Sequence, residues 1–294
     1  MPGSSQMITA MDDSRQDEVL RQRVGKVHLQ QRLGIEQDYE RRVFGQGRNF
    51  FHIENWYSVH SVIRNGLRLF LLHGRGRRNA RDIRVCRNDV YLPDLPETFA
   101  GYSILQISDM HLDMAPDFPH ALIAAVRGVD YDLCVITGDF RANTFGPWEP
   151  AVDGMRQVRV QLRGDVYGIL GNHDTIRMVP ALEAMDIRML LNEQVVIRRG
   201  DDAIYLAGID DPHYYRADNL EKAADPIPEE AVSILLTHSP EIYRHAAHAD
   251  FDLLLCGHTH GGQICLPGGL PVMCNARCPR AFCRGAWQYE GLQG

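Results

Sequence analysis

Short apolar runs that stop at polar residues are the dominant pattern of this sequence. There are five, at residues 102–108, 133–137, 166–170, 232–236 and 253–256. Apolar runs of about four to eight residues are typical of strands buried in a sheet. Between the runs, apolar residues recur at helical spacing over residues 117–129, 149–162, 175–185 and 240–249. Strands that alternate with helices predict a layered α/β fold, which binds ligands at the carboxyl ends of its strands.

The N-terminal part of the chain has a different pattern. We predict a helical and basic extension at residues 1–82, followed by the main domain at 83–294. Residues 18–44 are expected to be helical, because Leu20, Val24 and Val27 recur at helical spacing among Arg, Gln and Glu.

Residues 55–72 have the spacing of an amphipathic helix, and the chain between residues 64 and 87 carries eight arginines and one acid. Two interpretations of this segment are open. It either lies on an anionic membrane or admits a lipid-tailed substrate, or it packs on the main domain with its arginines in solvent.

Composition excludes several classes of protein. The net charge of −7 argues against a nucleic-acid binder, because phosphate backbones require a basic surface. The first 17 residues lack the basic start and apolar core of a secretory signal, and no stretch reads as a membrane span. Seven cysteines without an export signal predict reduced thiols. We therefore expect a cytoplasmic protein. If it binds a membrane, we expect it to do so as a peripheral protein on the inner face.

Polar residues with metal-binding atoms follow all five apolar runs. They are Asp109, His111, Asp139, Asn172, His173, His238, His258 and His260. This set carries too many ligands for one ion, and a carboxylate shared between two cations is chemically sensible. The imidazoles favour manganese, iron or zinc over magnesium, and manganese is the preferred expectation.

The motifs Asp109-x-His111, Gly138-Asp139, Gly171-Asn172-His173-Asp174, Thr237-His238 and Gly257-His258-Thr259-His260-Gly261-Gly262-Gln263 resemble those of the calcineurin-like metallophosphoesterases. The last motif is similar to the bacterial membrane-associated subgroup. The resemblance implies a four-layer αββα sandwich. It also implies that Asp109, His111 and His260 hold one metal, that Asn172, His238 and His258 hold the other, and that Asp139 bridges them. His173 would face the phosphate, with Asp174 orienting its ring.

The activity that this resemblance implies is hydrolysis of a phosphoester or pyrophosphate bond, by in-line attack of a metal-bridging hydroxide. The substrate would be a phosphate-containing small molecule or a lipid, for example UDP-2,3-diacylglucosamine. Two alternatives remain. One is a phosphodiesterase or phosphatase for soluble substrates, which should tolerate deletion of residues 1–85. The other is a non-catalytic scaffold, which the complete ligand set disfavours.

Other features give weaker expectations. Arg141 and Asn143 follow the bridging aspartate and are candidates for substrate contact. Four cysteines crowd the C-terminal tail, where free or buried thiols are expected rather than a zinc site. Residues 210–213 form either a loop near the site or a solvated turn. About thirty residues follow the last motif, fewer than in the subgroup, which leaves the edge of one sheet undetermined.

Overall fold

A computed structural model describes residues 16–44, 65, 68–69, 73–262, 265–266, 270–271 and 274–294. Apart from residues 65 and 68–69, the amphipathic helix predicted at 55–72 lies outside these ranges. Within the described parts of the chain, no helix combines the length and the apolar character needed to span a bilayer.

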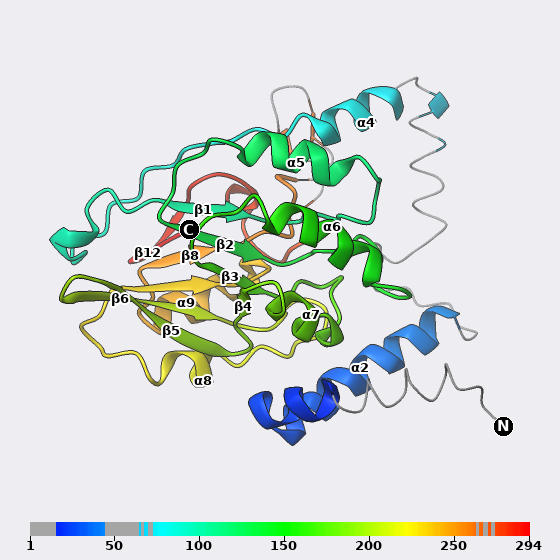
Figure 1. Ribbon diagram of the computed structural model, residues 1–294. Helices are drawn as coiled ribbons and strands as arrows, with labels where there is room; N and C mark the ends of the chain where they lie inside the picture. Colours follow the sequence, from blue (N-terminus) through cyan, green and yellow to red (C-terminus); the bar gives the residue numbers. More distant parts are fainter. Residues whose placement is uncertain are drawn as a thin grey trace.

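The first sheet is parallel and has the order β1-β2-β3-β4 (Figure 1). Its strands are β1 (Ile104–Ile107), β2 (Leu133–Thr137), β3 (Val166–Ile169) and β4 (Ile187–Met189). The helices α5 (Phe118–Val126), α6 (Glu149–Arg159) and α7 (Val179–Glu183) cover one face, with the 3₁₀ turn η3 (Ile176–Met178) before α7; the 3₁₀ turn η2 (Glu97–Phe99) precedes β1. Their apolar residues form one buried cluster with the sheet, which explains the helical spacing in the sequence.

The second sheet has the order β11-β12-β8-β7-β6-β5. Its strands are β5 (Glu193–Arg199), β6 (Asp202–Gly208), β7 (Ser233–Leu236), β8 (Leu253–Leu255), β11 (Gln288–Tyr289) and β12 (Leu292–Gln293). The pairs β6/β7, β7/β8 and β8/β12 are parallel, whereas β5/β6 and β11/β12 are antiparallel. The helices α8 (Leu220–Ala224) and α9 (Tyr243–His248), with the 3₁₀ turn η4 (Pro240–Ile242), cover its outer face.

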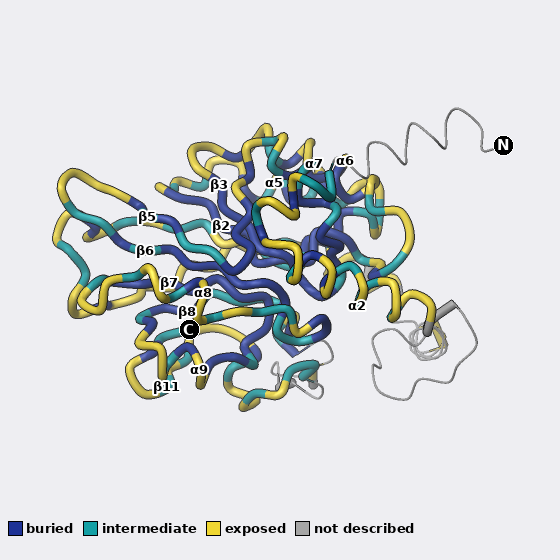
Figure 2. The backbone as a smooth tube through the Cα atoms, turned by 90° about the horizontal axis from the view of Figure 1, so that it is seen from below, coloured by how far each residue is buried: buried dark blue, intermediate teal, exposed yellow. Residues whose placement is uncertain are grey.

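The two sheets pack face to face. Residues such as Val135 and Ile169 of the first sheet share one buried cluster with Leu206 and Leu236 of the second. Seen from below, the layers follow one another from α5–α7 through the two sheets to α9 (Figure 2). The predicted αββα sandwich is confirmed, and its parallel strands bring the polar ends of both sheets to one edge.

The N-terminal helices pack on this sandwich. Residues 16–24 are helical, and α2 (Lys26–Phe44) follows after a break at Gly25, whose φ is +87°. Leu20, Val24 and Leu29 are buried in the cluster that lies under α5–α7. Val27 is 71% exposed, so its predicted place on the apolar face is wrong. The break at Gly25 rotates the second helix, and the helical spacing does not continue across it.

The segment after the undescribed region begins with α4 (His73–Arg81), which lies beside α5. Arg81 forms an ion pair with Asp117, the residue before α5, at 2.6 Å. Residues 82–91 then run without regular structure along the surface. Arg81 is therefore bound to the main domain, as the packing interpretation of the basic segment requires.

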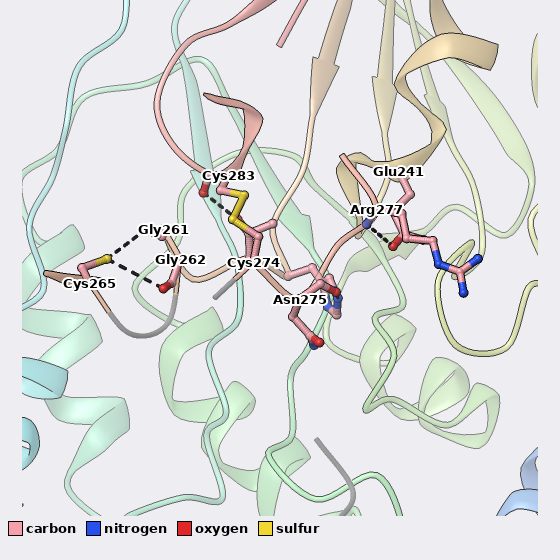
Figure 3. The surroundings of a disulfide bond; sticks show 10 residues. Glu241, Gly261, Gly262, Cys265, Cys274, Asn275, Arg277 and Cys283 are labelled. Carbon is pink, nitrogen blue, oxygen red and sulfur yellow. Dashed lines mark hydrogen bonds between the residues drawn. A yellow bond between two sulfur atoms is a disulfide. The ribbon is translucent and has the colours of Figure 1, made fainter. Parts of the chain in front are cut away.

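The C-terminal tail departs from the expected chemistry. It contains the short strands β9 (Cys265–Leu266) and β10 (Leu270–Pro271) and the 3₁₀ turn η5 (Arg280–Cys283). Cys274 and Cys283 form a disulfide, so the prediction of free thiols is wrong for these two residues (Figure 3). The turn between them brings their Cα atoms to 6.5 Å, within the range that a disulfide bridges. Cys265 and Cys278 are free, as are Cys86, Cys134 and Cys256.

Candidate metal centre

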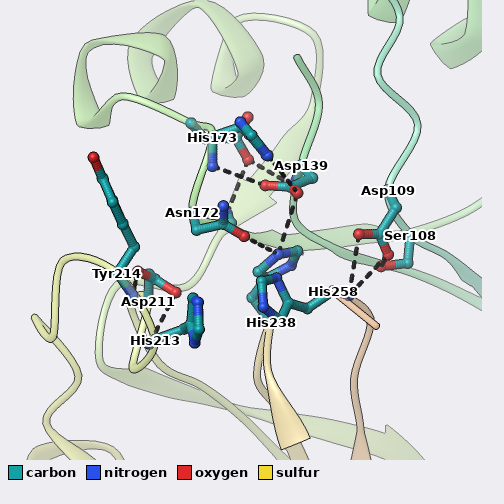
Figure 4. A network of polar contacts seen from close by, with 12 residues as sticks. Ser108, Asp109, Asp139, Asn172, His173, Asp211, His213, Tyr214, His238 and His258 are labelled. Carbon is teal, nitrogen blue, oxygen red and sulfur yellow. Dashed lines mark hydrogen bonds and ion pairs between the residues drawn. The ribbon is translucent and has the colours of Figure 1, made fainter. Parts of the chain in front are cut away.

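The predicted ligands all lie at strand ends on one edge of the sandwich. Asp109 and His111 follow β1, Asp139 follows β2, and Asn172 follows β3. The second sheet contributes His238 after β7, and His258 and His260 after β8. Figure 4 shows the side chains of Asp139, Asn172, His238 and His258 gathered at this edge, with Asp109 beside them.

One group of ligand atoms comes from Asp109, His111 and His260, all within 4.8 Å of one another. Nε2 of His260 lies 3.4 Å from Nε2 of His111 and 3.5 Å from Oδ1 of Asp109. Nδ1 of His111 donates to the carbonyl oxygen of Arg141 at 2.8 Å. This hydrogen bond fixes the tautomer that leaves the lone pair of Nε2 available to a cation.

A second group comes from Asp139, His238 and His258, again with ligand atoms within 4.8 Å, and all three residues are buried. Nε2 of His238 lies 2.9 Å from Oδ1 of Asn172, so the amide predicted to complete this set is adjacent.

Hydrogen bonds on the outer side fix both rings of this second group. Nδ1 of His238 donates to the carbonyl oxygen of Thr137 at 2.8 Å, and Nε2 of His258 donates to that of Asn275 at 3.0 Å. His238 therefore offers Nε2 inward, and His258 offers Nδ1.

Left-handed backbone is concentrated at these ligands. The φ values are 52° at Asp109, 44° at His111, 56° at Asp139, 69° at His258 and 48° at His260. Residues other than glycine seldom adopt φ > 0, and each such residue stores strain that its surroundings must compensate. Five of the predicted ligands have this costly backbone conformation, which indicates that the loops after these strands serve function at the expense of stability.

Glycines beside the ligands allow the loops to approach closely. A Cβ atom at Gly257 would collide with Ser108 and Asp109, and one at Gly171 would collide with the carboxylate of Asp139. Gly138 has a φ of +90°, and a Cβ there would lie 2.6 Å from the backbone nitrogen of Gly171. The glycines of the sequence motifs are therefore required by contacts between loops from different strands.

The electrostatics of the second group favour a cation. Burial works to raise the pKa of Asp139, but the charges of His238 and His173 outweigh it and hold that pKa well below its usual range. Burial likewise works to lower the pKa of His238, but Asp139 raises it to about 10. A site that charges a fully buried imidazole carries excess negative potential. Carboxylate, imidazole and amide donors in this arrangement fit a divalent transition metal.

His173 lies beside both groups, and its contacts differ from the predicted pairing with Asp174. Its Nε2 atom is 3.9 Å from Oδ2 of Asp139, and its ring lies edge-on to that of His111. Nδ1 lies 2.8 Å from the hydroxyl of Thr144, which takes the orienting place expected of Asp174. The Asp174 carboxylate instead accepts hydrogen bonds from the backbone N–H groups of residues 139, 140, 141 and 171. It ties together the loops that follow β2 and β3.

The two predicted substrate contacts have different positions. Arg141 is 3% exposed, and its guanidinium donates to the carbonyl oxygens of His173, Thr144 and Gly146. The short loop after Asp139 folds back over this side chain, and its role in substrate binding stays a prediction. Asn143 is exposed, and its amide lies 3.4 Å from Asp113.

Residues 210–213, for which the sequence left two interpretations open, belong to a loop that continues to residue 215. Asp210 and Asp211 are fully buried, so the solvated-turn interpretation is wrong. Asp211 accepts hydrogen bonds from the backbone of His213, Tyr214 and Tyr215. The His213 ring, labelled in Figure 4, packs on that of His258 with 4.3 Å between the ring centres. Its Nδ1 lies 3.1 Å from Glu241.

The sequence pattern of the calcineurin-like phosphoesterases matches residues 102–262. The chain belongs to that family. It is therefore a phosphoester hydrolase, and its family uses divalent metal ions. Every candidate ligand lies within the matched residues, whereas α2 and the disulfide lie outside them.

Relatives extend the comparison. The uncharacterized metallophosphoesterase YkoQ of Bacillus subtilis is 27% identical, over 66% of this chain and 73% of that protein. A transmembrane protein with metallophosphoesterase domain from Bos taurus is 32% identical, over 58% of this chain. The match spans 43% of the bovine protein, less than half of its length. Among solved structures, the phosphopantetheinyl hydrolase PptH of Mycobacterium tuberculosis has a TM-score of 0.41 and 9% identity, covering 65% of this chain and 86% of that chain.

Proposed function

We propose that this hydrolase uses two divalent metal ions to cleave a phosphoester or pyrophosphate bond. The observation that carries the proposal is the pair of three-residue donor groups, Asp109/His111/His260 and Asp139/His238/His258, at one edge of the sandwich. Asn172 would join the second group, and Asp139 would be shared. When bound, the ions supply Lewis-acid activation of water and neutralise phosphate charge.

The donor types favour a particular class of metal. Four of the seven predicted ligands are imidazoles, which suit manganese, iron or zinc better than magnesium. We propose manganese as the ion that supports turnover. The outer hydrogen bonds of His111, His238 and His258 would hold their rings in place before an ion arrives.

His173 is the candidate proton donor. Its ring is partly exposed beside the two donor groups, with one nitrogen 2.8 Å from the Thr144 hydroxyl and the other facing Asp139. In the proposed step, a protonated His173 ring delivers its proton to the leaving oxygen. Positioned acid–base groups contribute roughly 10²- to 10⁴-fold to turnover.

The substrate would reach the centre from the side of the first donor group. His260 is about one-third exposed there (35% of its side chain), whereas the second group is buried. A substrate whose phosphate group is accessible could enter from this side, and a nucleotide-lipid such as UDP-2,3-diacylglucosamine is one example. A soluble phosphodiester is the alternative.

A hydrolysis screen tests this proposal. Protein stripped of metal and reloaded with manganese should cleave an aryl phosphodiester, an aryl phosphomonoester or UDP-2,3-diacylglucosamine, and the stripped protein should not. Activity on the lipid alone supports the lipid substrate, whereas activity on aryl esters alone supports the soluble alternative. No metal-dependent turnover on any of the three would contradict the proposal.

Peripheral attachment to an anionic membrane is a second part of the proposal. α4 contributes exposed Arg75 and Arg78, and the resemblance to a membrane-associated subgroup points in the same direction. The ion pair between Arg81 and Asp117 leaves fewer arginines for lipid headgroups than the sequence alone suggests.

A further inference from the structure

Arg32 of α2 is completely buried, although it lies outside the residues that match the family. Its guanidinium stacks over the Tyr215 ring at 3.4 Å. It also donates to the Asp210 carboxylate at 3.2 Å, to Glu36 at 2.7 Å and to the carbonyl oxygen of Asp174 at 3.0 Å. One side chain of the N-terminal extension therefore contacts two loops of the main domain.

The first of these loops carries Asn172 and His173. Arg32 holds the Asp174 carbonyl oxygen, and Glu36, one helical turn later, accepts from the hydroxyl of Thr175 and from the backbone N–H of Ile176 at 3.0 Å. The Asp174 side chain continues the path, because it accepts from the backbone N–H of Asp139 at 2.8 Å. A chain of direct contacts thus runs from α2 to the proposed bridging ligand.

The second loop is 210–215. Arg32 binds it at both ends, through Asp210 and through the ring of Tyr215. His213 lies between these two points and packs on His258. The arginine therefore supports the surroundings of Asn172 and of His258, two predicted ligands of the same ion that come from different sheets.

Arginine suits this position because its planar fork binds several acceptors in fixed directions while its face stacks on an aromatic ring. A lysine carries the same charge but cannot reproduce the three directions.

We propose that α2, through Arg32 and Glu36, is a built-in positioning element of the metal centre and not a detachable extension. This inference rests on the proposed metal-dependent function, but its contacts exist without any ion. It also predicts that the enzyme does not tolerate deletion of residues 1–85, whichever substrate it uses.

Arg23 provides a matched control. It precedes α2, and it also makes several contacts to the main domain, with Glu183, the carbonyl oxygen of Met189 and Glu193. These partners lie on α7, β4 and β5, outside the loops that carry the predicted ligands. Loss of Arg23 should therefore loosen the same N-terminal helices without disturbing the metal centre directly.

The test compares full-length Arg32→Met, Arg32→Lys and Arg23→Met. Hydrogen exchange of the metal-free proteins should become faster at residues 139–141 and 171–176 in both Arg32 variants, and should stay as in the wild type there in Arg23→Met. Manganese affinity should fall by about 10- to 100-fold in Arg32→Met, as for other groups that orient ligands. Arg32→Lys should not restore it, and Arg23→Met should retain it.

Equal exchange and equal manganese affinity in Arg32→Met and Arg23→Met would overturn the proposal, since Arg32 would then act only on overall stability. Should Arg32→Met fail to fold, Glu36→Gln provides the milder variant, with faster exchange expected at Ile176 and unchanged exchange there contradicting the inference. Altered exchange without hydrolysis of any phosphoester would leave the positioning role standing and remove the proposed function. Hydrolysis of a phosphoester with unaltered exchange in the Arg32 variants would support the proposed function and remove the positioning role.

Discussion

Nε2 of His238 lies 3.3 Å from Oδ2 of Asp139, although the two residues follow strands of different sheets. Both side chains are buried, and each shifts the pKa of the other toward the charged form. The edge where the two sheets meet therefore gathers negative and imidazole groups with little solvent to screen them. A divalent cation satisfies such a site more completely than a single proton does.

His173→Ala should separate chemistry from metal binding. Turnover should fall by roughly 10²-fold or more. Both ions should stay bound, because the backbone N–H of residue 173, which donates to Asp139 at 2.9 Å, survives the change. Turnover and elemental analysis on the same sample check this. A parallel loss of metal and activity would make His173 a ligand.

Thr144→Val should have a smaller effect on the same step. It removes the hydroxyl that lies 2.8 Å from Nδ1 of His173 and keeps the shape of the side chain. A net hydrogen bond of about 1 kcal/mol corresponds to roughly fivefold in turnover. Steady-state kinetics should show that loss in turnover number, with metal content unchanged. A loss as large as that of His173→Ala would contradict the orienting role.

The disulfide should support the metal centre as well as the tail. Cys274 precedes Asn275, which holds the His258 ring, and the carbonyl oxygen of Cys283 accepts from Thr259 at 2.7 Å. Replacing both cysteines by serine should lower the free energy of unfolding by about 2–3 kcal/mol for a loop of this length. It should also weaken manganese binding, both measured against Cys265→Ser, which removes a free thiol. Seven reactive thiols, instead of five, in unreduced unfolded protein would contradict the disulfide.

The acid limit of stability should depend on Asp210. Burial works to raise its pKa, but Arg32 and His28 outweigh it and lower the pKa below the usual value. A lowered folded-state pKa contributes stability that is present above the unfolded pKa, near 3.9, and is lost as the pH falls through the folded value. Asp210→Asn should thus lower the melting temperature at pH 7 and flatten its decline below about pH 4. Parallel melting curves for the two proteins would contradict this assignment.

Vesicle sedimentation tests the membrane proposal. The wild type should bind anionic vesicles more than neutral ones, and salt should weaken the binding, because charges are screened over about 10 Å at 0.1 M. Replacing exposed Arg75 and Arg78 by glutamine should release the protein and leave hydrolysis of a soluble ester unchanged. Arg81→Gln is the control for loss of the ion pair with Asp117. Wild-type protein that never binds vesicles would leave α4 with a packing role alone.

The strands and their polar ends could be predicted from the sequence because both depend on local pattern. A buried parallel strand reads as a continuous apolar run, and Gly-Asp or Gly-Asn-His directly after it marks the ligand edge. The roles of Asp174 and Arg141 could not be predicted in this way. Their neighbours in sequence do not reveal that the Asp174 carboxylate binds the backbone of another loop, or that the loop after Arg141 folds over its side chain.

Contacts between residues far apart in the sequence also could not be predicted from local sequence patterns. Arg32 meets Asp174 and Asp210, 142 and 178 residues away, and in the sequence it looks like any solvated arginine of a polar helix. The pairing of Cys274 with Cys283 depends on the turn between them, which no spacing rule specifies. The positive φ values of the predicted ligands depend on how the loops turn after each strand, and only the neighbouring glycines indicate such turns in the sequence.

Manganese titration of metal-stripped protein tests the central claim most directly. The wild type should bind two ions per chain. Asp139→Asn should bind well under two and lose turnover, because that carboxylate is proposed to serve both ions. Asp132→Asn is the control, since that residue caps the backbone of Ser103 at the start of β1, and it should bind two. One ion per wild-type chain, or unchanged binding and turnover in Asp139→Asn, would contradict the two-metal account.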